Sequence, residues 1–150
     1  MKKIAVGSDH GGVELKEEIK KFLNGEGYEF KDFGTNSTES CDYPDYALPV
    51  AEAVAAKEYD LGILVCGTGI GIGIAANKVP GIRAALCSDT FSAHATREHN
   101  NANILTLGQR VVGPGLAIDI VKTFLNTEFE GERHQKRIDK ISEIEKKYNK

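Results

Sequence analysis

The chain has little of what marks a secreted, membrane-spanning or disulfide-stabilised protein. It contains no tryptophan, and its three cysteines, Cys41, Cys66 and Cys87, include no C-x-x-C pair. An odd number of cysteines without paired spacing argues against a disulfide framework and fits a reducing, cytoplasmic compartment. No stretch approaches the roughly 20 apolar residues of a membrane span. The apolar run that follows Met1 is too short for a signal peptide, so we expect none.

Motifs for metal ions and nucleotides are also missing. The sequence has no H-x-H, H-E-x-x-H or Cys/His cluster, and His94 and His99 are five residues apart and off a common helical face, so no metal is expected. A Walker A ending is absent, and Ile72 and Ile74 stand where G-x-G-x-x-G needs glycine. The net charge of −3 gives no reason to expect nucleic acid or membrane partners.

What the 150 residues do contain is a regular alternation of strand-like and helical patterns. Such alternation predicts a single α/β domain over 1–150, a three-layer sandwich in which helices cover both faces of a five-stranded parallel sheet. We place its core at about 1–126, with Asp45 capping the second helix. The expected strands are 3–7, 28–33, 61–66, 83–87 and 104–107, and the expected helices are 13–24, 46–57, 70–79, 90–99, 115–126 and 133–148.

The C-terminal extension, about 127–150, differs in kind from the rest. Ile138, Ile141, Ile144 and Tyr148 form a narrow apolar stripe on a highly charged helix. Such a helix either packs on its own core or reaches another subunit, and we favour a helical arm packed on a second copy.

The most informative segment joins a buried strand to a run of alternating glycines. The apolar strand 61–65 is followed by Cys66-Gly67-Thr68-Gly69-Ile70-Gly71-Ile72-Gly73. Glycine at every other position weakens both helix and strand, but it lets backbone N–H groups crowd around an anion at a helix N-terminus. The same N–H groups favour a thiolate over a thiol. The segment therefore predicts a base or nucleophile, Cys66, beside an oxyanion site.

Other polar groups lie at predicted element ends. Ser8-Asp9-His10-Gly11-Gly12 follows the first strand, where ligands bind in such sheets. His99 lies in a polar segment before the last strand and suits proton transfer near neutral pH. Arg133 and Arg137 share one helix face, and two guanidinium groups in that arrangement suit a phosphate, although spacing alone favours an ordinary solvated surface.

Together, these motifs occur in the order in which they stand in ribose-5-phosphate isomerase type B, a family that also holds galactose-6-phosphate isomerase subunits. The resemblance covers nearly the whole chain, and its specific parts are the Cys-Gly-Thr-Gly run and Arg97-Glu98-His99-Asn100-Asn101. It implies a Rossmann-like sandwich and a homodimer or dimer of dimers, with each active site built from two subunits. It also implies a phosphorylated sugar as substrate and no cofactor.

The resemblance further implies roles for individual residues. Cys66 is the base that moves the C2 proton, and His99 the acid that assists furanose ring opening. The chemistry of an aldose–ketose isomerisation adds a role for the Thr68 hydroxyl, which we expect to pass a proton between O1 and O2. One departure is Glu132, where the family pattern has glycine, and we expect its side chain to face solvent. The residues expected to contact substrate are Asp9, His10, Tyr43, Gly67, Gly69, Ile70, Gly71, Asn100, Arg110, Arg133 and Arg137, with the arginines toward the phosphate.

The leading hypothesis is therefore an aldose–ketose isomerase that interconverts D-ribose 5-phosphate and D-ribulose 5-phosphate through an enediolate. A hexose 6-phosphate, galactose or allose, is an alternative substrate for the same machinery. Two other classes stay open: a nucleotide-binding module with Asp89 on a ribose, and a dimeric scaffold with inert cysteines.

Overall fold

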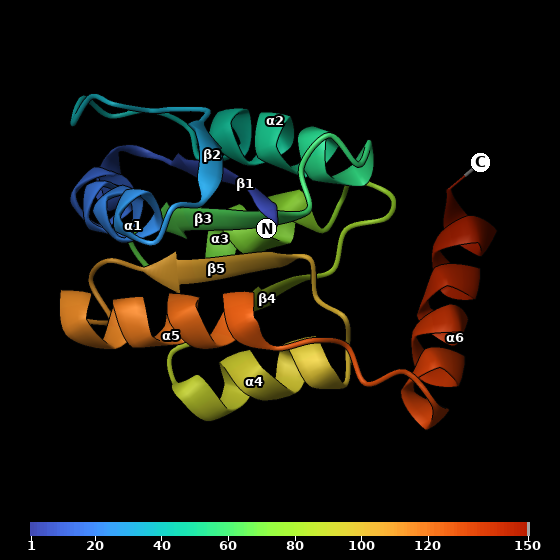
Figure 1. Cartoon of the computed structure of the whole chain (residues 1–150). Coiled ribbons are helices and arrows are strands. Elements are labelled where there is room, and N and C mark those ends of the chain that lie inside the picture. The colour runs from blue at the N-terminus through green and yellow to red at the C-terminus, as the bar shows by residue number, and fades with distance from the viewer. Residues whose placement is uncertain (150) are drawn as a thin grey trace.

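The computed structural model describes residues 1–149, and the predicted alternation of strands and helices is confirmed (Figure 1). A single 3-10 turn, His10–Gly12, precedes the first helix. In chain order the elements are β1 (Lys3–Ser8), α1 (Val13–Gly25), β2 (Glu29–Asp32), α2 (Pro44–Ala55), β3 (Leu61–Cys66), α3 (Ile70–Ala76), β4 (Ala84–Leu86), α4 (Thr90–Glu98), β5 (Ile104–Gly108), α5 (Pro114–Asn126) and α6 (Arg133–Tyr148).

The strands form one five-stranded, all-parallel sheet in the order β2-β1-β3-β5-β4. Side chains of α1, α4 and α5 share an apolar cluster on one face of the sheet, and those of α2 and α3 share a second cluster on the other face. This is the predicted three-layer, Rossmann-like sandwich. The central strand β3 is buried at all six positions, as a continuous apolar run between two helical layers requires.

Some element boundaries differ from the prediction. The second helix begins at Pro44 rather than at 46, and Asp45 lies inside its first turn, so Asp45 does not cap it. Proline suits the first position of a helix, because the N–H that proline lacks would have no intrahelical partner there. The third helix ends at Ala76 rather than at 79. Asn77 terminates it, since its side chain exchanges two hydrogen bonds with the backbone of Ala84, at 2.7 and 3.0 Å.

The strand order places a topological switch point between β1 and β3. The chain leaves β1 toward β2 on one side and continues beyond β3 on the other. At such a point the loops after neighbouring strands diverge and leave a crevice at the carboxyl ends, which is where parallel α/β sheets bind ligands. The segments after β1 and β3 are Asp9–Gly12 and Gly67–Gly69, so the sheet brings two of the predicted site segments together.

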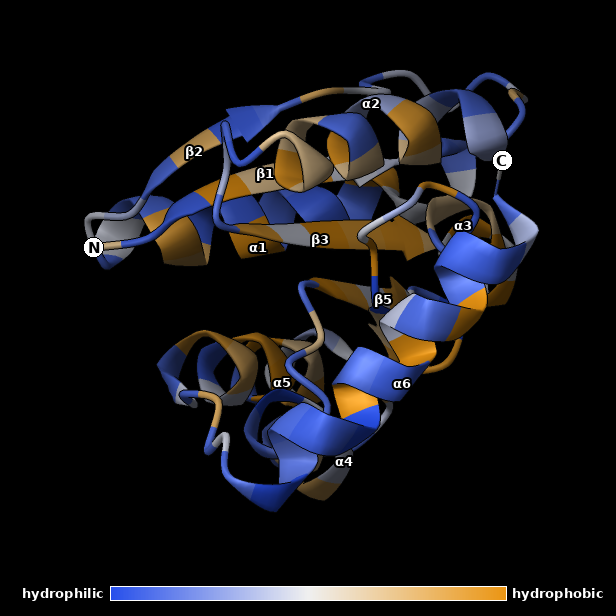
Figure 2. Cartoon of the chain, turned by 90° about the vertical axis from the view of Figure 1, so that its right-hand side faces the viewer, coloured by the Kyte–Doolittle hydropathy of each residue, from blue (hydrophilic) through white to orange (hydrophobic). Residues whose placement is uncertain are grey.

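Helix α6 stands apart from this α/β body, on the side where the strands begin (Figures 1 and 2). Glu145 ties it back, because its carboxylate accepts the Gly81 N–H at 3.0 and 3.2 Å. Within residues 1–149 no helix is long and apolar enough to cross a membrane.

A buried cation holds the segment that follows β2. The Lys16 side chain is fully buried, and its ammonium donates to Asp32 at 2.8 Å, to Asn36 at 3.1 Å and to the Thr35 carbonyl. Burial raises the pKa of Asp32, but hydrogen bonds from Lys16, Lys20 and the Gly34 N–H outweigh it, so the pKa lies below the ordinary 3.8. The 34–36 segment in turn pairs with the end of β1, through Gly34 and Thr35 to Ser8.

We therefore expect acid to destabilise the protein through Asp32. A carboxylate whose folded pKa is lowered contributes stability that is present above pH 3.8 and is lost as the pH falls through the lowered value. Asp32→Asn leaves the Lys16 charge buried without its partner and should cost about 3 kcal/mol at pH 7. Urea unfolding at pH 7 and at pH 3 measures both effects. An Asp32→Asn protein as stable as the parent at pH 7 would contradict this account.

Candidate active site

Cys66 ends β3 at the carboxyl edge of the sheet. Its side chain is only 5% exposed, and it packs with Ala47, Leu64 and Ile72. The sulfur is nevertheless not sealed in hydrocarbon, because the Gly69 N–H donates to Sγ at 3.1 Å. A backbone donor aimed at the sulfur stabilises negative charge on it. The thiol therefore sits where the sequence predicted it, at the strand exit and under the glycine turn.

Gly69 makes this turn possible. Its φ of 78° is in the left-handed region, and a Cβ built there would lie 2.7 Å from the Leu107 carbonyl carbon. Only glycine adopts this conformation so close to backbone without strain. The Thr68 hydroxyl, at an exposed position, accepts the Ile70 N–H at 3.2 Å. A Cβ on Gly71 would meet the Tyr43 ring at 2.7 Å, so Tyr43 lies directly over the start of α3.

The end of β1 brings Asp9 and His10 to the same edge. The Asp9 N–H donates to the Val65 carbonyl at 3.2 Å, and its carboxylate accepts the Gly11 N–H at 2.8 Å. Nδ1 of His10 accepts the Cys41 N–H at 3.2 Å. Because Nδ1 is an acceptor in this bond, the hydrogen of the neutral ring is on Nε2, which is left as a donor.

Arg110 completes the group at the carboxyl edge. The backbone N–H of Arg110 donates to the Gly67 carbonyl at 3.0 Å, and the backbone N–H of the neighbouring Gln109 donates to the Cys66 carbonyl at 2.9 Å. A Cβ on Gly67 would lie 3.5 Å from the Arg110 Cδ. The structure therefore brings nine predicted residues together at this edge, which are Asp9, His10, Tyr43, Cys66, Gly67, Thr68, Gly69, Gly71 and Arg110; Ile70 begins α3 beside them.

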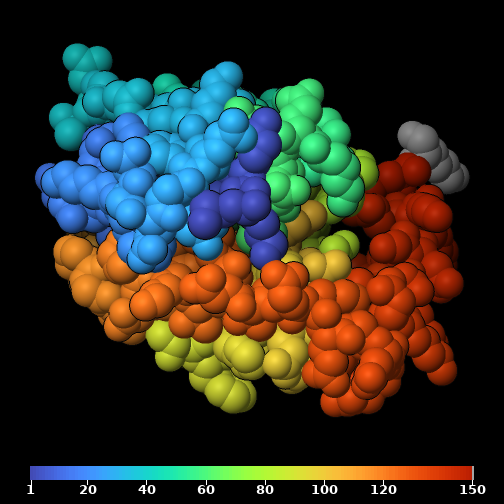
Figure 3. All heavy atoms as spheres, viewed as in Figure 1, coloured from blue at the N-terminus to red at the C-terminus, as the bar shows by residue number. Residues whose placement is uncertain are grey.

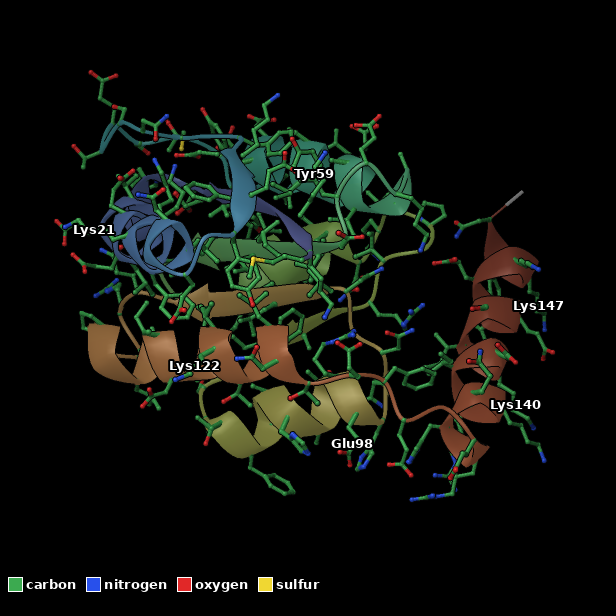
Figure 4. The ribbon with its side chains drawn as sticks, viewed as in Figure 1. Lys21, Tyr59, Glu98, Lys122, Lys140 and Lys147 are labelled. Atoms are coloured by element: carbon green, nitrogen blue, oxygen red, sulfur yellow. The ribbon has the colours of Figure 1, made fainter. Side chains whose placement is uncertain are left out.

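The remaining predicted residues lie at the opposite edge of the sheet. His99 follows the last turn of α4, and Arg83, just before β4, donates to the carbonyls of Asn100 and Asn101 at 3.1 Å. The linker to α6 joins this edge, where the Glu130 N–H donates to the Glu98 carbonyl. Arg133 and Arg137 follow on exposed positions of α6. Figure 4 shows Glu98 at the end of α4 that faces the first turn of α6.

Within one chain the two groups do not meet. At about 3.3 Å per residue, the six residues of β3 span roughly 20 Å between the sheet edges. His99, Asn100, Arg133 and Arg137 are therefore far beyond hydrogen-bonding range of a sugar held beside Cys66 of the same chain.

Sequence reasoning missed two residues that build the second group. Arg97 is buried, and its guanidinium donates to Ala102 at 2.7 Å, to the Asn101 side chain at 2.9 Å and to Thr127 at 3.2 Å. It thereby fixes both the loop that carries His99 and the linker to α6. His134, in the first turn of α6, stacks its ring on that of His99 with centroids 4.4 Å apart. In the sequence, His134 lies between Arg133 and Arg137 on a charged helix, and this pattern does not indicate a contact with His99.

Glu132 lies where the family pattern has glycine. Its φ is 51°, in the left-handed region, which explains why glycine suits this position. The Glu132 side chain is exposed, as expected.

His99, Glu130 and His134 also lie close enough to suggest a cation site, since their ligand atoms are within 4.8 Å of one another. The two rings, however, are nearly parallel, with an interplanar angle of 20°. Imidazole lone pairs lie in the ring planes, so stacked rings do not converge on one ion about 2.1 Å from each nitrogen. The geometry fits an aromatic pair better than a chelate.

Fold and site together define a class of protein. A thiol under backbone donors, at the switch point of a parallel α/β sheet, is suited to moving a proton next to a carbonyl and receiving the resulting oxyanion. The family model described as Ribose/Galactose Isomerase matches residues 4–141, and the chain belongs to this family.

The chain aligns with these relatives over nearly their whole length. The chain is 59% identical to the putative sugar phosphate isomerase YwlF of Bacillus subtilis over 146 residues, covering 97% of this chain and 98% of that protein. It is 54% identical to ribose-5-phosphate isomerase B of Escherichia coli over 149 residues, covering 99% and 100%. The structure of Clostridium thermocellum ribose-5-phosphate isomerase B superimposes with a TM-score of 0.97 at 62% identity, covering 98% and 99%. The predicted family and fold are thus confirmed.

The glycine turn yields a prediction. Gly69→Ala forces a side chain into a left-handed conformation and against the Leu107 backbone, which should cost about 2–3 kcal/mol of stability and misplace the N–H that faces Cys66. Gly113→Ala is the matched control, because nothing lies within 4 Å of its added Cβ. Chemical unfolding of both variants measures the difference. Equal stabilities would contradict the role given to Gly69.

Proposed function

We propose that the protein interconverts D-ribose 5-phosphate and D-ribulose 5-phosphate. The observation that carries this proposal is the Cys66 sulfur, held at the switch point with the Gly69 N–H directed at it. Two of the relatives compared above are named ribose-5-phosphate isomerase B. The same thiol chemistry accounts for an aldose–ketose step without a redox cofactor.

The reaction is a proton transfer beside a carbonyl. As thiolate, Cys66 removes the proton from C2 of the open-chain aldose, the electron pair forms the C1–C2 double bond, and the carbonyl oxygen becomes an oxyanion. The Thr68 hydroxyl moves a proton from O2 to O1, and the Cys66 thiol returns its proton to C1. General acid–base catalysis of this kind contributes about 10²–10⁴-fold in rate.

The developing oxyanion is received by the backbone. The first N–H groups of a helix have no intrahelical partner. At the start of α3 the Ile70 N–H donates to the Thr68 hydroxyl, so the N–H groups that follow it, of Gly71 and Ile72, receive the oxyanion. Removing one such donor typically costs about 3 kcal/mol of transition-state stabilisation. Asp9, His10 and Tyr43 surround the same crevice and contact the sugar hydroxyls.

Each complete site uses two copies of the chain. His99, Asn100, Arg133 and Arg137 lie at the opposite edge of the sheet, so a second copy supplies them to the Cys66 edge of the first. Two surfaces support such a homodimer. Ile70 and Ile74 on α3 are 51% and 60% exposed beside the site, and the α6 stripe leaves Ile141 and Ile144 49% and 61% exposed. Burying these side chains is favourable by roughly 25 cal/mol per Å² of apolar surface.

The two arginines of α6 bind the phosphate in this arrangement. They lie four residues apart on one helix face, and bidentate hydrogen bonds from guanidinium groups suit a phosphate. Glu130 forms an ion pair with the Arg133 guanidinium at 3.3 Å, and the phosphate takes the place of this carboxylate when it binds. The phosphate is remote from C1 and C2 and provides binding energy that orients the reacting carbons.

Two alternatives differ in how well they fit. The nucleotide module needs Asp89 for a ribose, but that carboxylate caps α4 and accepts the Ser92 N–H at 2.7 Å and the Ser92 hydroxyl at 3.0 Å. A hexose 6-phosphate substrate leaves the role of every residue unchanged. It requires only more space between the two copies that form the site. Kinetics with allose and galactose 6-phosphates beside ribose 5-phosphate decide it.

The first test removes the base. Cys66→Ala should abolish isomerisation and also the exchange of the C1 proton of ribulose 5-phosphate with solvent deuterium, while phosphosugar affinity changes by only about threefold because no binding group is lost. Cys87→Ala is the matched control, since burial raises the pKa of that thiol to about 11. NMR detection of deuterium and calorimetric titration give the two readouts. Normal exchange in Cys66→Ala would exclude the assigned base.

The second test asks whether two copies share a site. Cys66→Ala and His99→Asn are each impaired alone, but unfolding and refolding them together in equal amounts should restore about a quarter of the parental activity. Half of the resulting dimers are mixed, and each mixed dimer has one intact site. Refolding each variant separately is the control. A mixture no more active than the mean of its parts would mean that each site lies within one chain.

A further inference from the structure

The His99 ring has an unusual neighbour in its own chain. Its side chain is 42% exposed at the end of α4, with Nε2 3.2 Å from Glu98 Oε1. An exposed histidine at a helix end rotates freely about its broad χ2 torsion unless something packs on its face. Here the His134 ring lies parallel to it, at 4.4 Å between centroids and 20° between planes. This offset of flat rings is the geometry that stabilises aromatic pairs.

His134 is buried beside His99, in the first turn of α6. Its side chain is only 5% exposed, and among residues 1–149 its Nε2 is a buried nitrogen without a hydrogen-bond partner. The nearest carboxylate oxygen, from Glu130, is 3.9 Å away. A buried nitrogen without a partner costs free energy, so its placement against His99 is not explained by a hydrogen bond of its own. What the imidazole does contact is the face of His99.

We propose that His134 is a positioning residue for His99: it holds the imidazole plane of His99 in the orientation that delivers a proton to the ring oxygen of the furanose. The inference rests on the function proposed above and deepens it, since it concerns the ring-opening step and not the proton transfer at C2.

Burial and nearby positive charges favour the neutral form of His134. Burial and the neighbouring Arg133 and His99 lower the pKa of His134, with Arg137 acting in the same direction and Glu130 opposing them. His99 has the Glu98 carboxylate at its edge, and Glu98 also faces His94 at 2.9 Å. A neutral His134 ring avoids the repulsion of two stacked imidazolium groups.

The test separates ring opening from the chemistry at C2. Ribose 5-phosphate is a furanose and must open before it reacts. Ribulose 5-phosphate stays open, because its O5 carries the phosphate and its remaining hydroxyls close no stable ring. Isomerisation of ribose 5-phosphate needs both steps, whereas deuterium exchange at C1 of ribulose 5-phosphate needs only the step at Cys66.

Three variants are compared: His134→Ala removes the ring, His134→Phe keeps a flat ring without nitrogens, and His94→Ala is the matched control. His94 faces the same Glu98 carboxylate but is not part of the stack. We expect His134→Ala to lower kcat for ribose 5-phosphate about tenfold, a part of the 10²–10⁴-fold that an acid contributes. Its exchange rate on ribulose 5-phosphate should stay within about twofold of the parent. His134→Phe should recover most of the kcat, and His94→Ala should leave both rates unchanged.

Two results would overturn the inference while leaving the proposed function intact. One is an equal loss of both rates in His134→Ala. The other is a His134→Phe protein as impaired as His134→Ala, which would mean that the imidazole nitrogens touch substrate directly. A parent protein that neither isomerises ribose 5-phosphate nor exchanges deuterium would instead refute the proposed function and the inference with it. Upfield shifts of the His99 ring protons, lost in His134→Ala and kept in His134→Phe, report the stack independently of activity.

Discussion

The direction of the strands is the constraint on which the rest of the structure depends. All five strands are parallel, so each crossover helix carries the chain back from the carboxyl edge to the amino edge before the next strand begins. Whatever follows a strand lies at one edge, and whatever follows a helix lies at the other. Cys66 follows β3, and His99 follows α4. No change of rotamer or loop joins them, because the sheet itself stands between the two edges. A site that needs both must be assembled from two chains.

Helix α6 carries the two arginines that the proposed two-chain site requires. It extends from the amino edge. The His134 ring packs on His99 at its start, Ile138 one turn later is buried, and Glu145 accepts the Gly81 N–H near its end. Between these contacts a groove of about 510 Å³ separates α6 from the body, visible as the hollow beside the helix in Figure 3. Lys140 and Lys147 point outward from the helix in Figure 4, so its charged face is turned to solvent.

The sequence predicted what depends on local chemistry. Five strands, the buried character of β3 and the turn after Cys66 follow from apolar runs and glycine spacing, which the fold does not override. It could not predict what depends on packing between distant segments. In the sequence, Lys16 is one of several charged residues expected on the first helix. In the structure it is fully buried, because Asp32 and the 34–36 segment contact its ammonium group. His134 lies between charged residues on a polar helix, and only the approach of α4 gives it a partner. The separation of the predicted residues between two edges likewise follows from topology; the order of the motifs does not reveal it, although the family resemblance implied a site built from two subunits.

Cys66 and Cys87 are both buried cysteines, and they differ in the groups that surround the sulfur. Both are buried, at 5% and 2% exposure, so depth does not distinguish them. Cys87 lies after the edge strand with Asp89 nearby, and burial together with that negative charge raises its pKa to about 11. Cys66 instead has an N–H of a glycine turn directed at its sulfur. A backbone N–H gives an anion the hydrogen bond that water would otherwise donate, and unlike water its orientation is already fixed. The sequence signal for this contact is the pattern of residues after the cysteine, because the left-handed glycine three positions on directs its N–H at the sulfur.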